Sequence, residues 1–535
     1  MQSPSVTGLP SRPEKLTFLT RFLATRDTID AARLKPSYYR ATFLVLLLFY
    51  LALTAAQASR HLWYDELFTY YIAKSPSLAS MWQNIRLDLT PPLVFLAERF
   101  ALKTFGDNLY AARLPSILGF AVGSFCFGKF VSNRLGLSYG ILAVLVVWAS
   151  PLEYYATEAR AYAIIIGFFG IAMLAWQQAI QLHRRIWPVA LLAFAISGMM
   201  CSHVLALIYA VPFLVAELLR WHENRRFDAP IWASLAIPAI SAVIYIPLMM
   251  RYQQSVYPFV TQSSPGKFFG FFYRMLGPVS LPLLIALCLA LAVGFRKCPW
   301  QGQHFPALLS VEWAFTWALI LIPALVTVAM MRSHGVAFPR YSAPAVFLFG
   351  ISFSFLLALY TKTSRTAAII ASATLLFYLA VSNAVVFKSS LQSLKARNTQ
   401  PPPEAIARVE PNLPLVTASA LNFLEMDKYA DPATVKRLYY LTDWEFAMRY
   451  AHATLFEGLP KMRGKFPVRA SIEPYRKFVV DHPHFLVLGE IDYPEQWLLR
   501  RLADIHASLQ YLGNYPGGQL YLVTMPGRAV PQLAE

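Results

Sequence analysis

Charged residues are scarce in this chain of 535 residues. Asp, Glu, Lys and Arg make up 14% of it, against about 25% in an ordinary soluble protein, whereas apolar residues make up 57%. The 37 prolines fit a membrane protein as well, because neighbouring helices can satisfy the carbonyl groups that a proline frees. This composition excludes an ordinary soluble domain and predicts an integral, multi-pass membrane protein.

Cysteine is also scarce. The four cysteines form no Cys-x-x-Cys pair, and none lies in the C-terminal tail, so we expect the tail to fold without disulfides. A cleavable signal peptide is not expected either, since the first apolar run begins only near residue 41 and lacks a small-residue cleavage site. We therefore interpret this run as a retained membrane span.

The net charge of +18 could suggest nucleic-acid binding, but its distribution does not. Residues 388–535 carry 17 basic and 15 acidic residues, so most of the positive excess lies earlier in the chain, in short loops between apolar runs. That arrangement follows the positive-inside rule of membrane proteins rather than the basic face of a DNA-binding protein. We expect membrane lipids, and no nucleic acid, among the partners.

Eleven apolar stretches are each interpreted as a membrane span, for which roughly 20 residues suffice. They lie at about 41–58, 110–131, 137–148, 161–182, 186–200, 204–219, 231–250, 275–295, 311–331, 343–360 and 366–387. Clusters of Arg and Lys in alternate loops place the N-terminal segment 1–40 in the cytoplasm. Because eleven is odd, the tail is expected on the outer side. The transmembrane domain is thus predicted at 41–387.

Two further segments lie outside the predicted spans. The first outer loop, 59–108, has apolar residues at helical spacings around Pro91 and Pro92, which predicts one or two amphipathic helices at the membrane interface. The tail, 388–535, begins with a stiff triple-proline linker at 401–403 and is predicted to be a small extracytoplasmic α/β domain without a phosphate loop or catalytic motif. Its expected strands are 414–417, 485–488 and 519–524, and its expected helices are 433–438 and 495–505. The role expected for the tail is stabilisation or acceptor docking.

Two adjacent acids, Asp65 and Glu66, follow Trp63 and Tyr64 where the chain leaves the first span. Charges beside a bilayer are costly and tend to be kept for function. Neighbouring residues on a helix point about 100° apart, so we expect Asp65 to face a cavity and Glu66 to bind a supporting partner. The alternative is a solvated turn or a helix N-cap.

The other candidates lie at helix ends on the same side. If the fourth helix begins before Glu158, then Glu158 and Tyr162 share one of its faces, while Arg160 does not. Arg340 opens the tenth span, and His203 lies in the turn between the fifth and sixth. The alternatives are a helix-capping acid, arginines that extend to lipid headgroups, and a plain polar turn residue.

Both signs of charge therefore meet at the outer face. Carboxylates suit general-base or metal-binding roles, and arginines suit a phosphate. This combination at a membrane surface indicates a lipid-linked phosphate substrate. The main rival is a transporter or flippase for a lipid-linked sugar phosphate. Transporters commonly have internal repeats and broken helices near the bilayer midplane, and we find no repeat in the sequence.

Several short motifs together resemble the GT-C glycosyltransferases, in particular the family 39 branch of protein O-mannosyltransferases and lipid A aminoarabinose transferases. They are Trp63-Tyr64-Asp65-Glu66, Thr90-Pro91-Pro92-Leu93, Ala111-Ala112-Arg113-Leu114-Pro115-Ser116, Tyr155-Ala156-Thr157-Glu158-Ala159-Arg160-Ala161-Tyr162 and Phe338-Pro339-Arg340-Tyr341-Ser342-Ala343-Pro344. The likeness is densest in the first 220 or so residues. Many relatives have His where this chain has Thr90, so any role of that His is absent here.

The resemblance implies a GT-C fold and transfer of a sugar from a polyprenyl-phosphate donor to a glycan, lipid or protein, by single displacement with inversion. It implies Asp65, Glu66 and Glu158 as catalytic residues. It implies donor binding by Arg160 and Arg340, to which we add Tyr64, Tyr162 and His203. Asp65 and Glu158 would hold a divalent cation, Mg or Mn, if one is used. The expected location is a bacterial inner membrane, with the site on its outer face.

Overall fold

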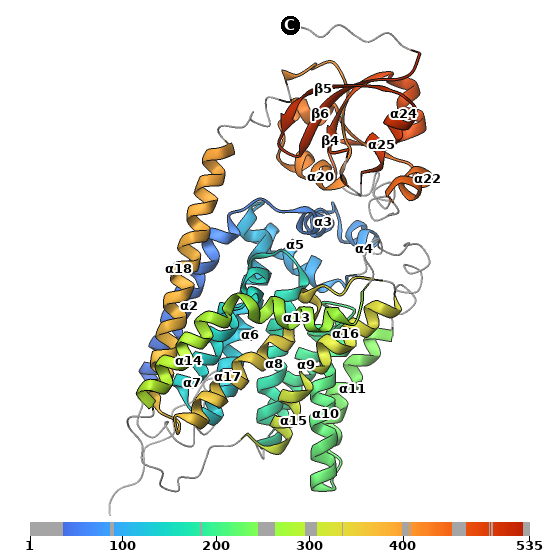
Figure 1. The fold of residues 1–535 in the computed structure, drawn as a ribbon. Coiled ribbons are helices and arrows are strands. Elements are labelled where there is room, and N and C mark those ends of the chain that lie inside the picture. The colour runs from blue at the N-terminus through green and yellow to red at the C-terminus, as the bar shows by residue number, and fades with distance from the viewer. Residues whose placement is uncertain are drawn as a thin grey trace, which may run out of the picture.

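The structure is a computed structural model. It describes residues 36–85, 90–181, 185–243, 263–294, 308–333, 335–397, 406, 408–451, 467–491, 493 and 496–527. The polar segment at 1–35, the triple proline and the end of the predicted seventh span lie outside the described residues. Three layers follow one another along the molecule (Figure 1): a bundle of long helices, a set of short helices, and an α/β domain that carries the C-terminal end of the chain.

The bundle is built from apolar helices, as the sequence predicts. Its helices are α2 (Pro36–Ala58), α6 (Leu109–Leu135), α7 (Leu137–Ala149), α8 (Ala161–Gln181), α9 (Ile186–Met200), α10 (Ala206–Asn224), α11 (Ala229–Val243), α14 (Ser280–Gly294), α15 (Ser310–Ala318), α16 (Leu321–Arg332), α17 (Phe347–Tyr360) and α18 (Arg365–Arg397). Short 3₁₀ segments η1 (Pro151–Thr157), η2 (Gly277–Val279) and η4 (Pro339–Val346) join some of them. One helix or a pair of helices occupies each predicted span, as far as those ranges are described.

Fewer than eleven of the described helices meet a criterion of both length and hydropathy for crossing a membrane. Among the described residues, six helical stretches are long and apolar enough to cross a membrane, or seven if α7 and η1, bent by 78°, form one broken span. Shorter apolar helices cover 41–55, 186–200 and 229–238. The protein is therefore an integral membrane protein with a mostly helical fold, and eleven crossings stay a prediction.

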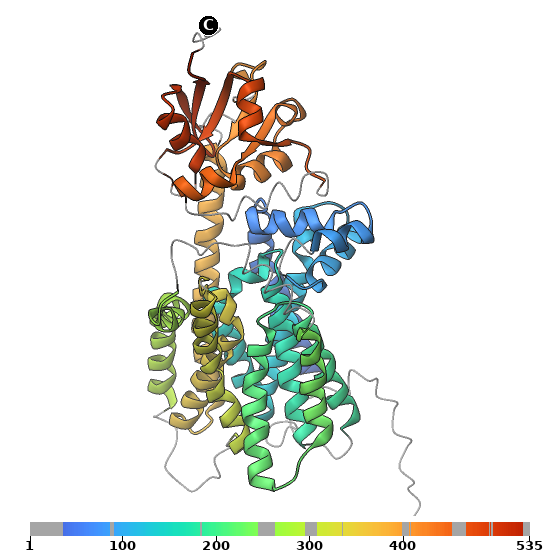
Figure 2. The same cartoon turned by 90° about the vertical axis from the view of Figure 1, so that its right-hand side faces the viewer.

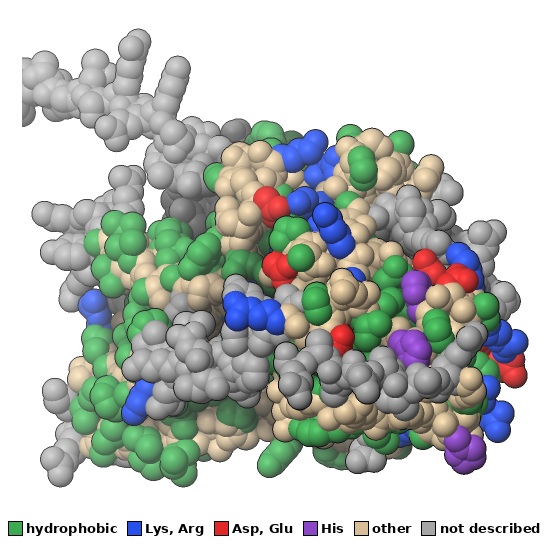
Figure 3. Space-filling model, turned by 90° about the horizontal axis from the view of Figure 1, so that it is seen from above, with side chains coloured by type: hydrophobic (Ala, Val, Ile, Leu, Met, Phe, Trp, Pro, Cys, Tyr) green, Lys and Arg blue, Asp and Glu red, His purple; other side chains and the backbone are tan. Residues whose placement is uncertain are grey.

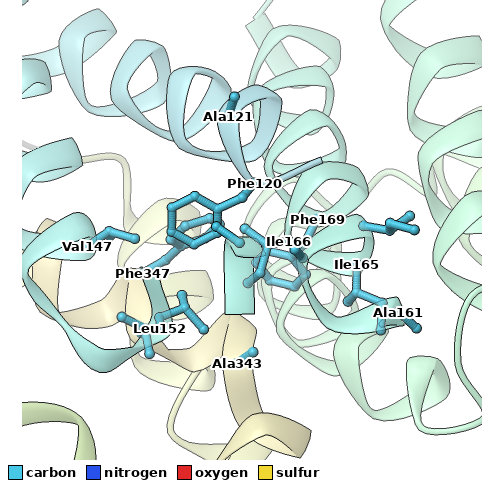
Figure 4. Close-up of a cluster of buried hydrophobic side chains, with 14 of the residues drawn as sticks. Phe120, Ala121, Val147, Leu152, Ala161, Ile165, Ile166, Phe169, Ala343 and Phe347 are labelled. Atoms are coloured by element: carbon cyan, nitrogen blue, oxygen red, sulfur yellow. The ribbon is translucent and has the colours of Figure 1, made fainter. Parts of the chain in front are cut away.

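Close contact between α6 and α8 organises the bundle. A Cβ atom on Gly123 would lie 2.3 Å from the carbonyl oxygen of Ile166, and one on Gly170 would lie 2.4 Å from the carbonyl oxygen of Gly123. Only glycine permits this approach, a common device where membrane helices pack. At the same level of α8, Phe169 packs on Phe347 of α17 with ring centroids 5.8 Å apart (Figure 4). The first turns of α8 are thereby held beside residues 119–123 of α6.

Short helices cover the end of the bundle that faces the α/β domain (Figures 1 and 2). They are α3 (Tyr64–Ala73), α4 (Leu78–Ile85) and α5 (Leu93–Phe105) from the loop predicted at 59–108, and α13 (Gly266–Leu276) from later in the chain. The loop thus forms three helices where one or two were predicted. Pro92 is the N-cap of α5, a position where a proline is tolerated because the backbone nitrogen at a helix start donates no hydrogen bond within the helix.

The C-terminal domain is an α/β domain, as predicted. Its sheet has strand order β3-β2-β1-β4-β6-β5, in which the first four strands are parallel and β6 and β5 are antiparallel. The strands are β1 (Leu415–Thr417), β2 (Leu438–Thr442), β3 (Ser471–Pro474), β4 (His484–Gly489), β5 (Ser508–Tyr515) and β6 (Gly518–Thr524). The helices are α20 (Ala420–Tyr429), α21 (Pro432–Lys436), α22 (Trp444–Phe446), η5 (Ala447–Ala451), α24 (Tyr475–Asp481) and α25 (Trp497–Asp504).

Two boundaries of this domain differ from the sequence prediction. α18 continues to Arg397, ten residues beyond the expected end of the last span at 387, and it extends toward the sheet (Figure 1). The predicted helix at 433–438 ends at Lys436, and Leu438 begins β2. The strands β2, β3 and β5 were not expected, and β5 has no clean alternation of buried and exposed residues.

Candidate active site

Asp65 lies between two arginines from different parts of the bundle. Its Oδ2 atom is 2.8 Å from a guanidinium nitrogen of Arg160 and 3.3 Å from one of Arg340. Asp65 is in the first turn of α3, Arg160 directly precedes α8, and Arg340 lies in η4. The Asp65 side chain is 22% exposed, so the cluster is accessible from solvent. The structure brings together three of the charged residues that the sequence analysis named as candidates.

Aromatic rings enclose the two arginines. The guanidinium of Arg340 lies 5.6 Å from the ring centre of Tyr162 and 5.9 Å from that of Trp63. Arg160 donates a hydrogen bond to the Tyr162 hydroxyl at 3.3 Å. Rings this close attract a cation and limit its contact with water. The arginines are therefore held with their charge directed at Asp65.

His203 belongs to the same aromatic group. It lies in the turn between α9 and α10, and its ring centre is 5.8 Å from those of both Tyr162 and Tyr341. Desolvation, followed by repulsion from Arg160 and Arg340, lowers the pKa of His203 to about 3. His203 is therefore neutral at physiological pH, and its Nδ1 accepts a hydrogen bond from the backbone N–H of Leu205.

Glu66 and Arg113 form a fully buried ion pair beneath this cluster. Arg113, from the first turns of α6, binds both carboxylate oxygens at 2.8 and 2.7 Å, and both side chains have no exposed surface. The backbone N–H of Ala159 donates to Glu66 as well, at 2.8 Å. Glu66 thus ties α3 both to α6 and to the residue beside Arg160. Its position suits support of the site rather than contact with a substrate.

Arg113 also binds the backbone that leads into α3. It donates to the carbonyl oxygens of Ala58 at 2.7 Å, Arg60 at 2.6 Å and His61 at 3.2 Å. A guanidinium offers five donors in a rigid fork, so one side chain can fix several acceptors at once. Arg113 therefore sets where α3 begins and, with it, where Asp65 lies.

Glu158 is buried close to the charged cluster. Among the described residues its Oε2 atom has no hydrogen-bond partner. Burial, reinforced by the nearby Glu66 carboxylate, raises the pKa of Glu158 from about 4.5 to about 7, although Arg160, Arg340 and Arg60 act in the opposite direction. Its protonation therefore changes near neutral pH, unlike that of an ordinary carboxylate.

One geometric expectation is wrong. Glu158 and Tyr162 do not share a helix face, because α8 begins only at Ala161 and Glu158 has extended backbone angles at the end of η1. Pro151 begins the tight 3₁₀ segment that follows α7, so the chain turns before it enters α8. This turn places Glu158 beside Arg160 without a helical spacing between them.

Tyr64 is buried in α3 beside Phe68, with ring centres 6.2 Å apart, and its role in donor binding stays a prediction. Sequence reasoning assigned no role to Arg113, Trp63 or Tyr341, all of which lie within its quoted motifs. A signal for Arg113 was present, since a lone arginine at the start of a membrane helix needs a buried partner. No comparable signal identified the two aromatic residues.

The described residues do not fit a resident divalent cation. They contain no group of three or more His, Cys, Asp or Glu side chains placed to hold a metal. The Asp65 oxygen that would bind the ion already faces Arg160 and Arg340, which would repel it. Mg²⁺ prefers six oxygen ligands, and Asp65 and Glu158 supply too few of them. We therefore derive no step through a metal.

The fold and the site define a polytopic membrane protein with a charged cluster at the end of its helical bundle that faces the C-terminal α/β domain. No protein-family model and no curated protein sequence matches the chain. Its structure is similar to that of ArnT from Cupriavidus metallidurans bound to undecaprenyl phosphate, with a TM-score of 0.55 and 12% identity over 93% of this chain and 100% of that one. For ArnT in the apo state the TM-score is 0.57, with 11% identity over 91% and 98%. The chain has the GT-C fold of that lipid A aminoarabinose transferase.

Proposed function

We propose that this protein transfers a sugar from a polyprenyl-phosphate donor to a glycan, lipid or protein acceptor. The observation that supports this most is the carboxylate of Asp65 between two guanidiniums, at the helix ends of a GT-C fold. The similar ArnT structure was obtained with undecaprenyl phosphate bound, which is a ligand of this class. A carboxylate that pairs with both arginines occupies the place that a donor phosphate would take.

The reaction follows from these charges. The donor phosphate binds Arg160 and Arg340, which releases Asp65 from its ion pairs. The acceptor hydroxyl attacks the anomeric carbon as the bond from that carbon to the phosphate oxygen breaks, and Asp65 accepts the hydroxyl proton. Polyprenyl phosphate leaves with one more negative charge than it carried in the donor, and the two arginines stabilise that charge. A single displacement inverts the anomeric configuration.

The orientation in the membrane is part of the proposal. The basic residues in the alternate loops support an orientation with the Asp65 cluster and the α/β domain on the outer face, which in a bacterium is the periplasmic side of the inner membrane. Reporter fusions near residues 300 and 420 test this orientation. Reporters that respond on opposite sides of the membrane support it, and reporters on the same side would refute it.

The purified protein in liposomes with radiolabelled polyprenyl-phosphate sugar tests the reaction. A transferase consumes the donor when extracts of the cell envelope supply an acceptor, and mass spectrometry of envelope glycans from a deletion strain identifies that acceptor. A flippase would move labelled donor across the bilayer without consuming it. That second result would overturn the proposal.

The pH profile tests the role of Glu158, whose pKa is raised to about 7. Below pH 7 the carboxyl is neutral. Above it, the ionised form adds negative charge beside Arg160 and Arg340, where the leaving phosphate also gains negative charge. We expect kcat/KM to fall as the pH rises through 7, and Glu158→Gln to stay active and lose this fall. If Glu158 were itself the base, kcat/KM would rise through pH 7 and Glu158→Gln would be inactive.

Chelation tests the hypothesis of a Mg or Mn cofactor. Because Arg160 and Arg340 already neutralise Asp65, we expect EDTA to leave the transfer rate unchanged. A rate that EDTA abolishes and that added Mg²⁺ or Mn²⁺ restores would show that a cation takes part.

A further inference from the structure

The last residues of α20 contact the layer of short helices that contains α3, and they do so through consecutive side chains. The Tyr71 hydroxyl of α3 donates to Oδ2 of Asp427 at 2.5 Å. Lys428 donates to the Tyr70 hydroxyl at 2.5 Å, and its Nζ lies 3.6 Å from Oδ1 of Asp107. Figure 1 shows α20 at the edge of the C-terminal domain that faces α3. The domain is thus joined to the helix that carries Asp65.

The contact through Asp427 is buried rather than superficial. The side chain has no exposed surface, and besides the Tyr71 hydroxyl its Oδ1 atom accepts hydrogen bonds from the backbone N–H groups of Arg469 and Ala470, each at 2.8 Å. A buried carboxylate is costly unless such donors surround it. One of its donors belongs to α3, so separating α20 from α3 would leave this group less satisfied.

Tyr429 reaches the segment directly before Asp65. Its hydroxyl oxygen accepts the backbone N–H of Leu62 at 2.9 Å, and its ring stacks on His61 with centroids 4.1 Å apart and planes 10° from parallel. Arg113 of α6 binds carbonyl groups of the same segment, including that of His61. The chain that enters α3 is therefore held by the transmembrane bundle through Arg113 and by the C-terminal domain through Tyr429.

We propose that the C-terminal domain completes the active site and that Tyr429 is a positioning residue for Asp65. The inference rests on the proposed sugar transfer, because it concerns the geometry of the residue assigned as the base. Asp65 must reach the acceptor hydroxyl, and a misplacement of about 1 Å can cost about 10²-fold in rate. Arg160 and Arg340 belong to other elements, so binding of the donor phosphate does not depend on this contact.

Two substitutions remove one hydroxyl each from opposite sides of the contact. Tyr429→Phe loses the acceptor of the Leu62 N–H and keeps the ring that stacks on His61. Tyr71→Phe loses the donor to Asp427. We expect each to lower kcat about three- to tenfold, the effect of one hydrogen bond, and to leave KM for the donor unchanged. The matched control is Tyr450→Phe, because the Tyr450 hydroxyl binds Asp504 within the C-terminal domain and should not affect transfer.

Hydrogen exchange at the Leu62 amide provides a second measurement, which does not require the protein to transfer sugar. In the Tyr429→Phe protein the Leu62 amide is expected to exchange faster than in wild type, and in the Tyr450→Phe protein at the wild-type rate. A Tyr429→Phe enzyme with the kcat of the control and unchanged exchange at Leu62 would overturn the inference. If the wild-type protein transferred no sugar, the proposed function would fail, and exchange at Leu62 would still decide whether Tyr429 holds this segment.

Discussion

Asparagine in place of Asp65 is expected to lower sugar transfer by about 10²–10⁴-fold, the usual contribution of a general base. The amide is nearly the same size, but it cannot accept the hydroxyl proton and leaves Arg160 and Arg340 without their shared carboxylate. The measurement is turnover of radiolabelled polyprenyl-phosphate sugar by equal amounts of purified protein.

The Asp65→Asn variant should still accumulate in the membrane, because all three side chains of the cluster are partly exposed and the asparagine amide oxygen can still accept a hydrogen bond from the arginines. Asp481→Asn is the matched control, an exposed acid of the C-terminal domain that is expected to retain full activity. Transfer at the wild-type rate in Asp65→Asn would refute the assignment of Asp65 as the base.

Methionine in place of Arg113 is expected to destabilise the fold by about 3–5 kcal/mol, because removing one partner leaves a buried charge uncompensated. The variant would leave the Glu66 carboxylate without its cationic partner and three backbone carbonyl groups before α3 without the hydrogen bonds that Arg113 donates. We expect little folded protein in detergent, measured by size-exclusion chromatography and thermal unfolding.

A double-mutant cycle separates this ion pair from general damage to α6. Glu66→Gln in the Arg113→Met background should cost much less than Glu66→Gln alone, because the pair is already broken. Arg226→Met, at an exposed arginine of the loop between α10 and α11, serves as the control and should unfold like wild type. Additive costs in the cycle would show that Glu66 and Arg113 do not stabilise each other.

Sequence reasoning identified much of the charged site because charge is costly in a chain this apolar. Asp65, Arg160 and Arg340 were singled out on that ground and by their place at predicted helix ends, and they meet in the structure. The contact between Asp65 and Arg340 joins residues 275 positions apart, and no local pattern predicts such a pairing. Their chemical roles stay predictions until the variants are assayed.

Local sequence patterns gave wrong helix and strand boundaries where those boundaries depend on how the chain turns. The helical spacing from Glu158 to Tyr162 was a reasonable prediction, but a 3₁₀ segment after Pro151 delays the start of α8 to Ala161. Similarly, Leu438 was expected to be the last residue of a helix but begins β2, whose Tyr and Thr residues favour a strand and which pairs with the buried strand β1.

The sequence by itself determined that this is a membrane protein of many apolar helices with a separate α/β tail, since hydropathy and charge act along the chain and need no partner. Only the tertiary structure decided what surrounds Asp65. Glycines let α6 and α8 approach closely, the buried Glu66–Arg113 pair fixes the start of α3, and Tyr429 contacts the same segment from the C-terminal domain. Those contacts depend on packing between distant residues, which hydropathy and local spacing do not encode.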